Sequence, residues 1–197
     1  MKTSLALISL LIATVTVLTA CGGGEAGGGV NPLERYAGIY YQCDGNTKQT
    51  ITVTAQGSDS IAVAFDEKIF DNDNCAGAVV GALTYPSPLT IRYTGKMTAK
   101  MPNVTILPFS DTVDAITSST PSMTQQLSGT GVDGLCVNFS NGQTCYDDLS
   151  VAAQTVNSAI YLTGNYFVFL DLTDDVLMPG DILSRDAAFN FSSLVAR

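Results

Sequence analysis

Hydrophobic and polar residues alternate along much of the chain after residue 35, in short runs that are separated by turn residues. The clearest runs are Thr50 to Thr54 and Ser60 to Phe65, and the segment between them, Gln56 to Asp59, has the composition of a hairpin loop. Thr, Val, Ile, Tyr and Phe are frequent in these runs, as in most β-strands. This pattern predicts an all-β domain.

Further runs of the same kind follow about once every ten residues. They are Ala78 to Tyr85, Leu89 to Met97, Asn103 to Phe109, Thr124 to Thr130, Leu135 to Phe139, Ala159 to Leu162 and Tyr166 to Leu170. Loops are predicted at Asp71 to Asn74, Pro86 to Pro88 and Thr117 to Pro121, and a short terminal helix at Asp186 to Ala196. Consecutive hairpins favour an antiparallel meander, which either closes as a barrel or splits into a two-sheet sandwich.

The first twenty residues follow a different pattern. One positive residue, Lys2, precedes an uncharged apolar run from Leu5 to Leu18, which is the layout of a secretory signal peptide. A membrane-spanning helix needs roughly 20 apolar residues, and this run is shorter. We therefore expect the segment to be removed rather than retained as an anchor helix.

The residues Leu18, Thr19, Ala20 and Cys21 resemble a lipobox, the recognition site of the lipoprotein signal peptidase. The resemblance implies cleavage before Cys21, a diacylglycerol on its thiol, and a fatty acid such as palmitate on its new amino group. An ordinary secreted protein with a chance cysteine at this position is the alternative. Proteobacterial lipoproteins with Asp after the cysteine tend to stay in the inner membrane. Gly22 therefore implies an outer-membrane anchor facing the periplasm, with the cell surface as the alternative.

A glycine-rich segment separates the signal peptide from the alternating part of the chain. Gly22 to Pro32 reads GGGEAGGGVNP, the composition of a flexible tether. We therefore divide the chain into a signal peptide (1–20), a lipidated Cys21 with its tether (21–35) and a single all-β domain (36–197). The last segment has the length of one ordinary domain.

Charge restricts the possible partners. Without the signal peptide the chain loses Lys2, which leaves eight basic against eighteen acidic residues and a formal charge of −10. The basic residues are scattered from Arg35 to Arg197, whereas nucleic-acid binding needs clustered Lys and Arg. We expect contact with a membrane through the lipid anchor, no nucleic-acid partner, and a protein or small-molecule partner that the sequence leaves unidentified.

Four cysteines remain once Cys21 is lipidated, namely Cys43, Cys75, Cys136 and Cys145. An even number in an oxidising compartment favours two disulfides. Of the three possible pairings we favour the local one, which joins Cys43 to Cys75 and Cys136 to Cys145. A metal site would need CxxC-type spacing or histidine partners, and the chain has neither.

The second of these disulfides depends on the register of a hairpin. Asn141-Gly142 is a strong two-residue turn signal. With these two residues at the turn, Cys145 would lie opposite Asn138 and only diagonal to Cys136. A direct bridge therefore requires the turn to shift or lengthen.

The complete absence of histidine excludes several catalytic sites. Ser-His-Asp and Cys-His nucleophile systems and histidine metal centres cannot form. Three carboxylate pairs, Asp66-Glu67, Asp147-Asp148 and Asp174-Asp175, leave glycosidase chemistry open. However, adjacent acids on a strand point to opposite faces, and acids near turns are usually solvated. We expect no enzyme activity, no cofactor and no metal.

Two short segments carry family resemblances. Tyr40 to Gly45 (YYQCDG), followed by an alternating strand, resembles the opening of periplasmic C-type lysozyme inhibitors over Tyr40 to Phe65. That family's Trp-containing motif is absent here, because the chain has no tryptophan. Tyr36 to Tyr40 (YAGIY) resembles the Gly-x-aromatic opening of lipocalin-like barrels.

The predicted function is a membrane-anchored, non-catalytic binding module of the cell envelope. The alternatives are an inhibitor of an envelope-directed enzyme such as lysozyme, and a carrier of a small apolar ligand. A deep apolar cavity would favour the carrier, and a filled barrel would favour recognition at the surface.

Overall fold

The computed structural model describes residues 30–172, 176–178 and 180–195, and the regular secondary structure of these residues is nearly all β. A 3-10 turn, η1 (Glu34–Tyr36), precedes the first strand, and a short helix, α1 (Ser192–Val195), follows the last. The strands are β1 (Gly38–Asp44), β2 (Thr47–Gln56), β3 (Ser60–Asn72), β4 (Ala76–Thr84), β5 (Leu89–Lys100), β6 (Ser110–Thr120), β7 (Met123–Thr124), β8 (Gln126–Ser128), β9 (Val132–Asp133), β10 (Cys136–Phe139), β11 (Gly142–Cys145), β12 (Ser150–Val151), β13 (Gln154–Thr163), β14 (Tyr166–Leu170) and β15 (Ile182–Ser184). Within these residues no helix is long and apolar enough to span a membrane.

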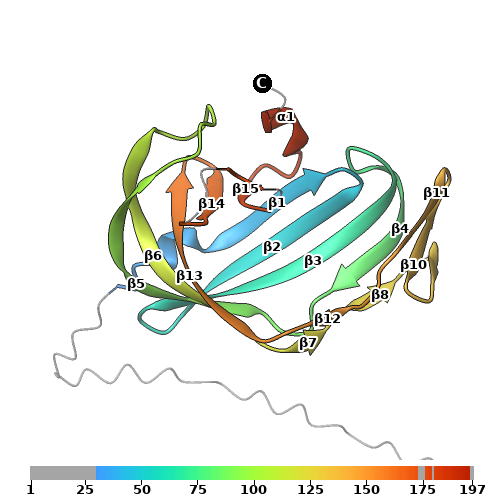
Figure 1. Cartoon of the computed structure of the whole chain (residues 1–197), viewed down its shortest axis with the longest axis horizontal. Helices are drawn as coiled ribbons and strands as arrows, with labels where there is room; N and C mark the ends of the chain where they lie inside the picture. The colour runs from blue at the N-terminus through green and yellow to red at the C-terminus, as the bar shows by residue number, and fades with distance from the viewer. Residues whose placement is uncertain (1–29, 173–175, 179, 196–197) are drawn as a thin grey trace, which may run out of the picture.

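Ten of the described strands form one antiparallel sheet, in the order β2-β1-β15-β14-β13-β6-β5-β3-β4-β8. Because β2 also pairs with β3, the first eight strands of this order close into a ring. Around the ring, β1, β2, β3, β5, β6, β13, β14 and β15 follow one another in chain order, while β4 and β8 lie outside it (Figure 1). The predicted antiparallel meander is therefore confirmed, and it closes as a barrel.

The long strand β3 belongs to both the barrel and a side lobe. Its first residues, Ser60 to Val63, pair with β5 in the ring, and Asp66 to Asn72 pair with β4 outside the ring. Beyond β4, the hairpin of β10 and β11 and the short strands around it cover a separate apolar cluster, the lobe cluster. Its buried residues are Ile69, Leu83, Val137 and Leu149.

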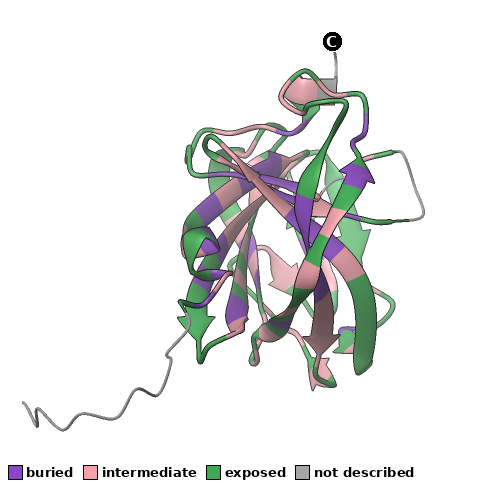
Figure 2. Cartoon of the chain, turned by 90° about the vertical axis from the view of Figure 1, so that its left-hand side faces the viewer, coloured by how far each residue is buried: buried purple, intermediate pink, exposed green. Residues whose placement is uncertain are grey.

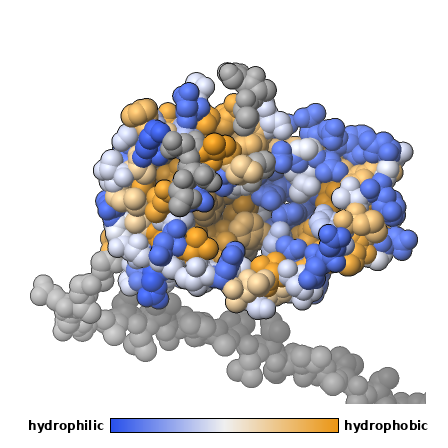
Figure 3. Space-filling view, in the orientation of Figure 1, coloured by the Kyte–Doolittle hydropathy of each residue, from blue (hydrophilic) through white to orange (hydrophobic). Residues whose placement is uncertain are grey.

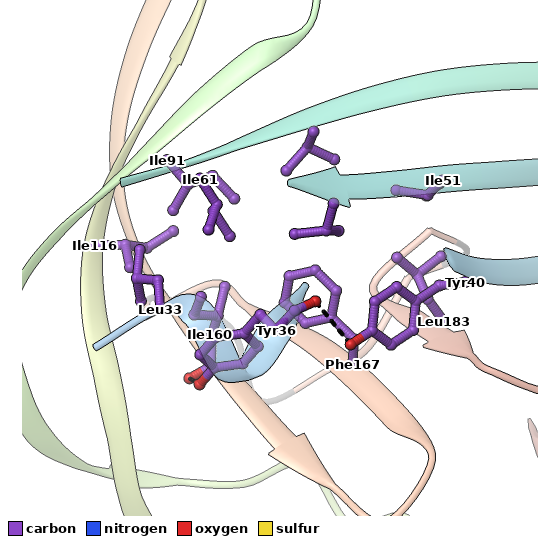
Figure 4. Packing of buried hydrophobic residues seen from close by; sticks show 12 residues of the cluster. Leu33, Tyr36, Tyr40, Ile51, Ile61, Ile91, Ile116, Ile160, Phe167 and Leu183 are labelled. Atoms are coloured by element: carbon purple, nitrogen blue, oxygen red, sulfur yellow. Dashed lines mark hydrogen bonds between the residues drawn. The ribbon is translucent and has the colours of Figure 1, made fainter. Parts of the chain in front are cut away.

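Residues 31–36 close one end of the barrel, which we call the closed end. Leu33 and Tyr36 are fully buried among the strands (Figure 4), and Asn31 Nδ2 donates to Ser60 O at 2.7 Å in the β2–β3 turn. Arg185, directly after β15, donates to the carbonyl of Ala37 at 3.3 Å. Asn31 and Leu33, which belong to the predicted tether segment 21–35, are thus packed against the barrel.

Side chains alternate between faces along most strands, as the hydrophobic pattern predicts (Figure 2). The main cluster lies inside the barrel at its closed end and includes Ile51, Val63 and Phe167. Strand β14 differs because it is buried on both faces. Phe167 lies in the main cluster, whereas Val168 lies in a second cluster with Met101.

Most predicted strands lie within observed ones, and Tyr166 to Leu170 coincides with β14. The strand predicted at Asn103 to Phe109 is wrong, because this segment is the loop between β5 and β6. Pro102 and Pro108 lack the N–H groups that a strand ladder needs.

The loop predicted at Thr117 to Pro121 is also wrong, since Thr117 to Thr120 form the end of β6. Backbone pairing with β13 holds these residues in the sheet, and Thr117 and Asn157 are joined by a 2.9 Å side-chain hydrogen bond. The predicted terminal helix is reduced to α1 within the described residues.

The four cysteines pair locally, as predicted. Cys43 is bonded to Cys75, and Cys136 to Cys145. In the β10–β11 hairpin, Phe139 pairs with Gly142 and Cys136 pairs directly with Cys145. The turn therefore lies at Ser140-Asn141, one residue earlier than the Asn-Gly signal indicates, and this shift brings the two cysteines opposite each other.

Candidate functional site

Polar side chains line the end of the barrel opposite the closed end, which we call the mouth. Ile51 of β2 and Val63 of β3 lie in the main cluster. Nearer the mouth, the same strand faces present Gln49 and Glu67, which are paired in the ladder. The inner wall of the barrel therefore changes from apolar to polar along its length.

A cavity of about 340 Å³ opens at the mouth, beside the β1–β2 turn. Its polar lining residues are Gln42, Asp44, Asn46, Thr47 and Gln49. None of the described residues that line it is basic. A space-filling view shows the molecule hollowed in front of β2 and β3, with hydrophobic residues inside the hollow and hydrophilic residues on its right side (Figure 3).

Glu67 is held in place by two hydrogen bonds to one of its carboxylate oxygens. Tyr85 donates its hydroxyl to Glu67 Oε1 at 2.7 Å, and Gln49 donates from Nε2 to the same oxygen at 3.1 Å. The Tyr85 ring also packs against the Phe65 ring, with their centres 5.5 Å apart. We call Glu67, Gln49, Tyr85, Phe65 and the nearby Tyr146 the Glu67 site.

The electrostatics of the Glu67 site follow from burial without a counter-ion. Burial raises the pKa of the Glu67 carboxyl above its usual value, although the hydrogen bonds from Tyr85 and Gln49 act in the opposite direction. Burial and then the Glu67 charge raise the pKa values of the Tyr85 and Tyr146 hydroxyls. Among the described residues, no basic side chain forms an ion pair with Glu67.

A second buried carboxylate, Asp114, lies at the closed end and is only 1% exposed. Its Oδ2 accepts from the Tyr36 hydroxyl at 2.8 Å and is also paired with Arg35, and Lys96 Nζ lies 3.6 Å from Oδ1. These contacts connect η1 to β5 and β6. With its charge compensated by two cations, Asp114 is a structural element rather than a binding group.

The residues predicted to carry chemistry are dispersed. Cys21 and Asp174-Asp175 lie outside the described residues. Asp147 and Asp148 are exposed, and the Asp148 side chain accepts from the Ser150 N–H at 2.9 Å. In the third pair, Asp66 is exposed and Glu67 is half-buried, on opposite faces of β3, as predicted. No pair of adjacent acids in the described part of the chain shares one site.

The β5–β6 loop presents an apolar surface. Phe109 is 80% exposed, and a groove of about 520 Å³ beside it is lined by Met101, Pro102 and Leu107 among others. The hydrophobic residues of this loop account for the strand wrongly predicted there, and neither Asp114 nor Gln49 is among the predicted site residues. No local pattern distinguishes these two from solvated polar residues, because their surroundings come from strands that are distant in sequence.

Comparison with protein-family models, with curated proteins and with solved structures gives no match for this chain. Within the described residues, no three acidic or cysteine side chains are grouped so that they would hold a metal ion. The functional argument therefore rests on the geometry of the mouth.

Proposed function

We propose that this chain is a lipid-anchored, non-catalytic binding module of the bacterial cell envelope, which recognises its partner at the barrel mouth. The observation that carries the proposal is the contrast between a filled closed end and a polar mouth. The Tyr36 and Tyr40 rings each lie 5.2 Å from the Phe167 ring, in the middle of the main cluster. These rings pack against one another at the closed end, which favours recognition at the surface over carriage of an apolar ligand in that end.

The other features of the chain are consistent with this proposal. The lipobox at Cys21 and the glycine-rich tether would place the domain close to a membrane. Without histidine, the usual general bases of hydrolases are missing. The disulfides fit an oxidising compartment such as the periplasm.

Inhibition of an envelope-directed enzyme such as lysozyme is the second candidate. Asp44 lines the mouth cavity, and Glu67 accepts a hydrogen bond from Gln49, which also lines this cavity. None of the described residues that line the cavity is basic. An acidic mouth complements a basic enzyme surface and accelerates encounter with it.

Site-specific photo-crosslinking in cells tests where recognition takes place. A photoreactive amino acid at Thr47, which lines the mouth cavity, should give a discrete adduct. The same amino acid at Thr54, exposed on the outer face of β2, should not give that adduct. Equal labelling at both positions would overturn recognition at the mouth. A substrate that the wild type turns over and the Asp147→Asn variant does not would overturn the non-catalytic assignment.

A further inference from the structure

Only one of the two carboxylate oxygens of Glu67 accepts hydrogen bonds from the described residues. Both hydrogen bonds, from Tyr85 and from Gln49, go to Oε1. No described residue donates a hydrogen bond to Oε2, and no described basic group forms an ion pair with this side chain. A half-buried carboxylate therefore remains without a compensating positive charge.

The lysines of the neighbouring strand positions do not supply this charge. Lys68 follows Glu67 directly, so strand alternation places it on the outer face, where it is exposed. Lys48 precedes Gln49 and also points outward, and its Nζ donates to the carbonyl of Ala187 at 2.8 Å. Among the described residues, these lysines therefore leave the Glu67 carboxylate unpaired.

Aromatic rings beside the carboxylate make this position suitable for an organic cation. Phe65 and Tyr85 form a tilted pair with an interplanar angle of 46°. Burial, and then the Glu67 charge, raises the pKa of the Tyr146 hydroxyl. Aromatic faces attract ammonium groups, and a carboxylate adds a charge-assisted hydrogen bond.

We propose that the Glu67 site binds an organic ammonium group, with the carboxylate as its counter-ion and the rings of Phe65, Tyr85 and Tyr146 around it. Gln49 belongs both to this site and to the lining of the mouth cavity of about 340 Å³, so the site adjoins that cavity. A free alkylamine and a lysine side chain of a protein offer the same chemistry. The inference rests on the proposed recognition at the mouth and names the ligand class.

Titration calorimetry on the mature lipidated protein in detergent micelles tests the site with two probes, butylammonium chloride and hen lysozyme. We expect saturable binding that Glu67→Gln weakens roughly ten-fold, because the variant keeps the shape and loses the charge. Tyr85→Leu, which removes a ring, should weaken binding roughly five-fold. Asp66→Asn is the matched control, because it removes the same charge from the outer face of the same strand, and it should change affinity less than roughly two-fold.

The two probes distinguish the source of the ammonium group. Glu67-dependent binding of butylammonium assigns a free amine, and Glu67-dependent binding of lysozyme alone assigns a protein side chain. Absence of saturable binding to both probes, or equal affinity in wild type and Glu67→Gln, would overturn the inference. In that case a Thr47 adduct that persists in the Glu67→Gln background would leave recognition at the mouth intact.

Discussion

At the scale of single residues, two buried acids have opposite environments. Asp114 at the closed end is paired with Arg35 and Lys96, whereas Glu67 near the mouth is bonded only to neutral groups among the described residues. A buried charge costs less stability when it is paired than when it is unpaired. The two acids therefore respond differently to substitution.

Replacing Asp114 by Asn should lower the free energy of unfolding by about 2 kcal/mol, because hydrogen bonds to a charged group are lost in a buried position. The Arg35 side chain is half-exposed and can be rehydrated, which limits the loss. Urea denaturation measures the change. The control is Asp59→Asn, which breaks the exposed ion pair with Arg92 and should lower the free energy of unfolding by less than about 1 kcal/mol. Equal losses in the two variants would contradict a structural role for Asp114.

The raised pKa of Glu67 predicts a dependence of stability on pH. The folded state holds the Glu67 proton over a pH range just above the ordinary value of 4.5, so the free energy of unfolding falls as pH rises through that range. Glu67→Gln removes this contribution. We therefore expect the variant to gain stability relative to the wild type as pH rises from about 4.5, until Glu67 is fully ionised. Denaturation curves at several pH values, with Asp66→Asn as reference, test this, and an advantage for Gln that shrinks over this range would contradict it.

At the scale of elements, turn chemistry and strand pairing compete. The Asn141-Gly142 signal identifies the β10–β11 hairpin, but the observed turn lies one residue earlier, where Cys136 and Cys145 are paired. A covalent bond between the strands outweighs the preference of a two-residue turn, which is smaller than the energy of a disulfide. At the β5–β6 loop, prolines outweigh hydrophobicity in the same way.

The two disulfides should contribute unequally to stability. Cys43 and Cys75 are 32 residues apart and Cys136 and Cys145 are 9 apart, so the first constrains the unfolded chain more, by roughly 1 kcal/mol. The double change of Cys43 and Cys75 to Ala should lower the melting temperature more than the corresponding change of Cys136 and Cys145. Calorimetry measures both. The reverse order would mean that native-state strain or residual structure in the unfolded chain outweighs loop entropy.

At the scale of the whole molecule, ring closure gives the barrel one end filled by residues 31–36 and one end lined by polar side chains. Residues 31–36 fill one end and bring the start of the domain against β5 and β6 through Arg35 and Asp114. The mouth stays accessible at the other end. This division lets one barrel combine a stable core with an exposed polar site.

Lipidation of Cys21 is the prediction on which the location of the molecule depends. Mass spectrometry of the mature amino terminus should find an acylated cysteine at this position, because the preceding residues match a lipobox. Cys21→Ser should move the protein out of the membrane fraction, because the variant has no thiol to lipidate and so loses the acyl chains that hold it in the bilayer. An unmodified amino terminus near residue 21, or unchanged fractionation of the variant, would contradict the prediction.

The amino-acid pattern was sufficient for those features that depend on neighbours along the chain. Alternation and turn residues predicted most strands, and the even set of cysteines predicted the local disulfide pairing. Alternation also predicted that Asp66 and Glu67 lie on opposite faces of β3. Each of these properties follows from local backbone geometry or from short loops.

Closure of the barrel and the environment of its acids depend on pairings between distant segments. Tyr41 of β1 pairs with Ser184 of β15 across most of the folded chain, and Arg35 meets Asp114, which is 79 residues away. Alternation is the same in a sandwich and in a barrel, so no local pattern distinguishes them. Glu67 is a similar case. Alternation along β3 places it on the opposite face from Asp66, but its lack of a basic partner among the described residues depends on how strands distant in sequence are arranged.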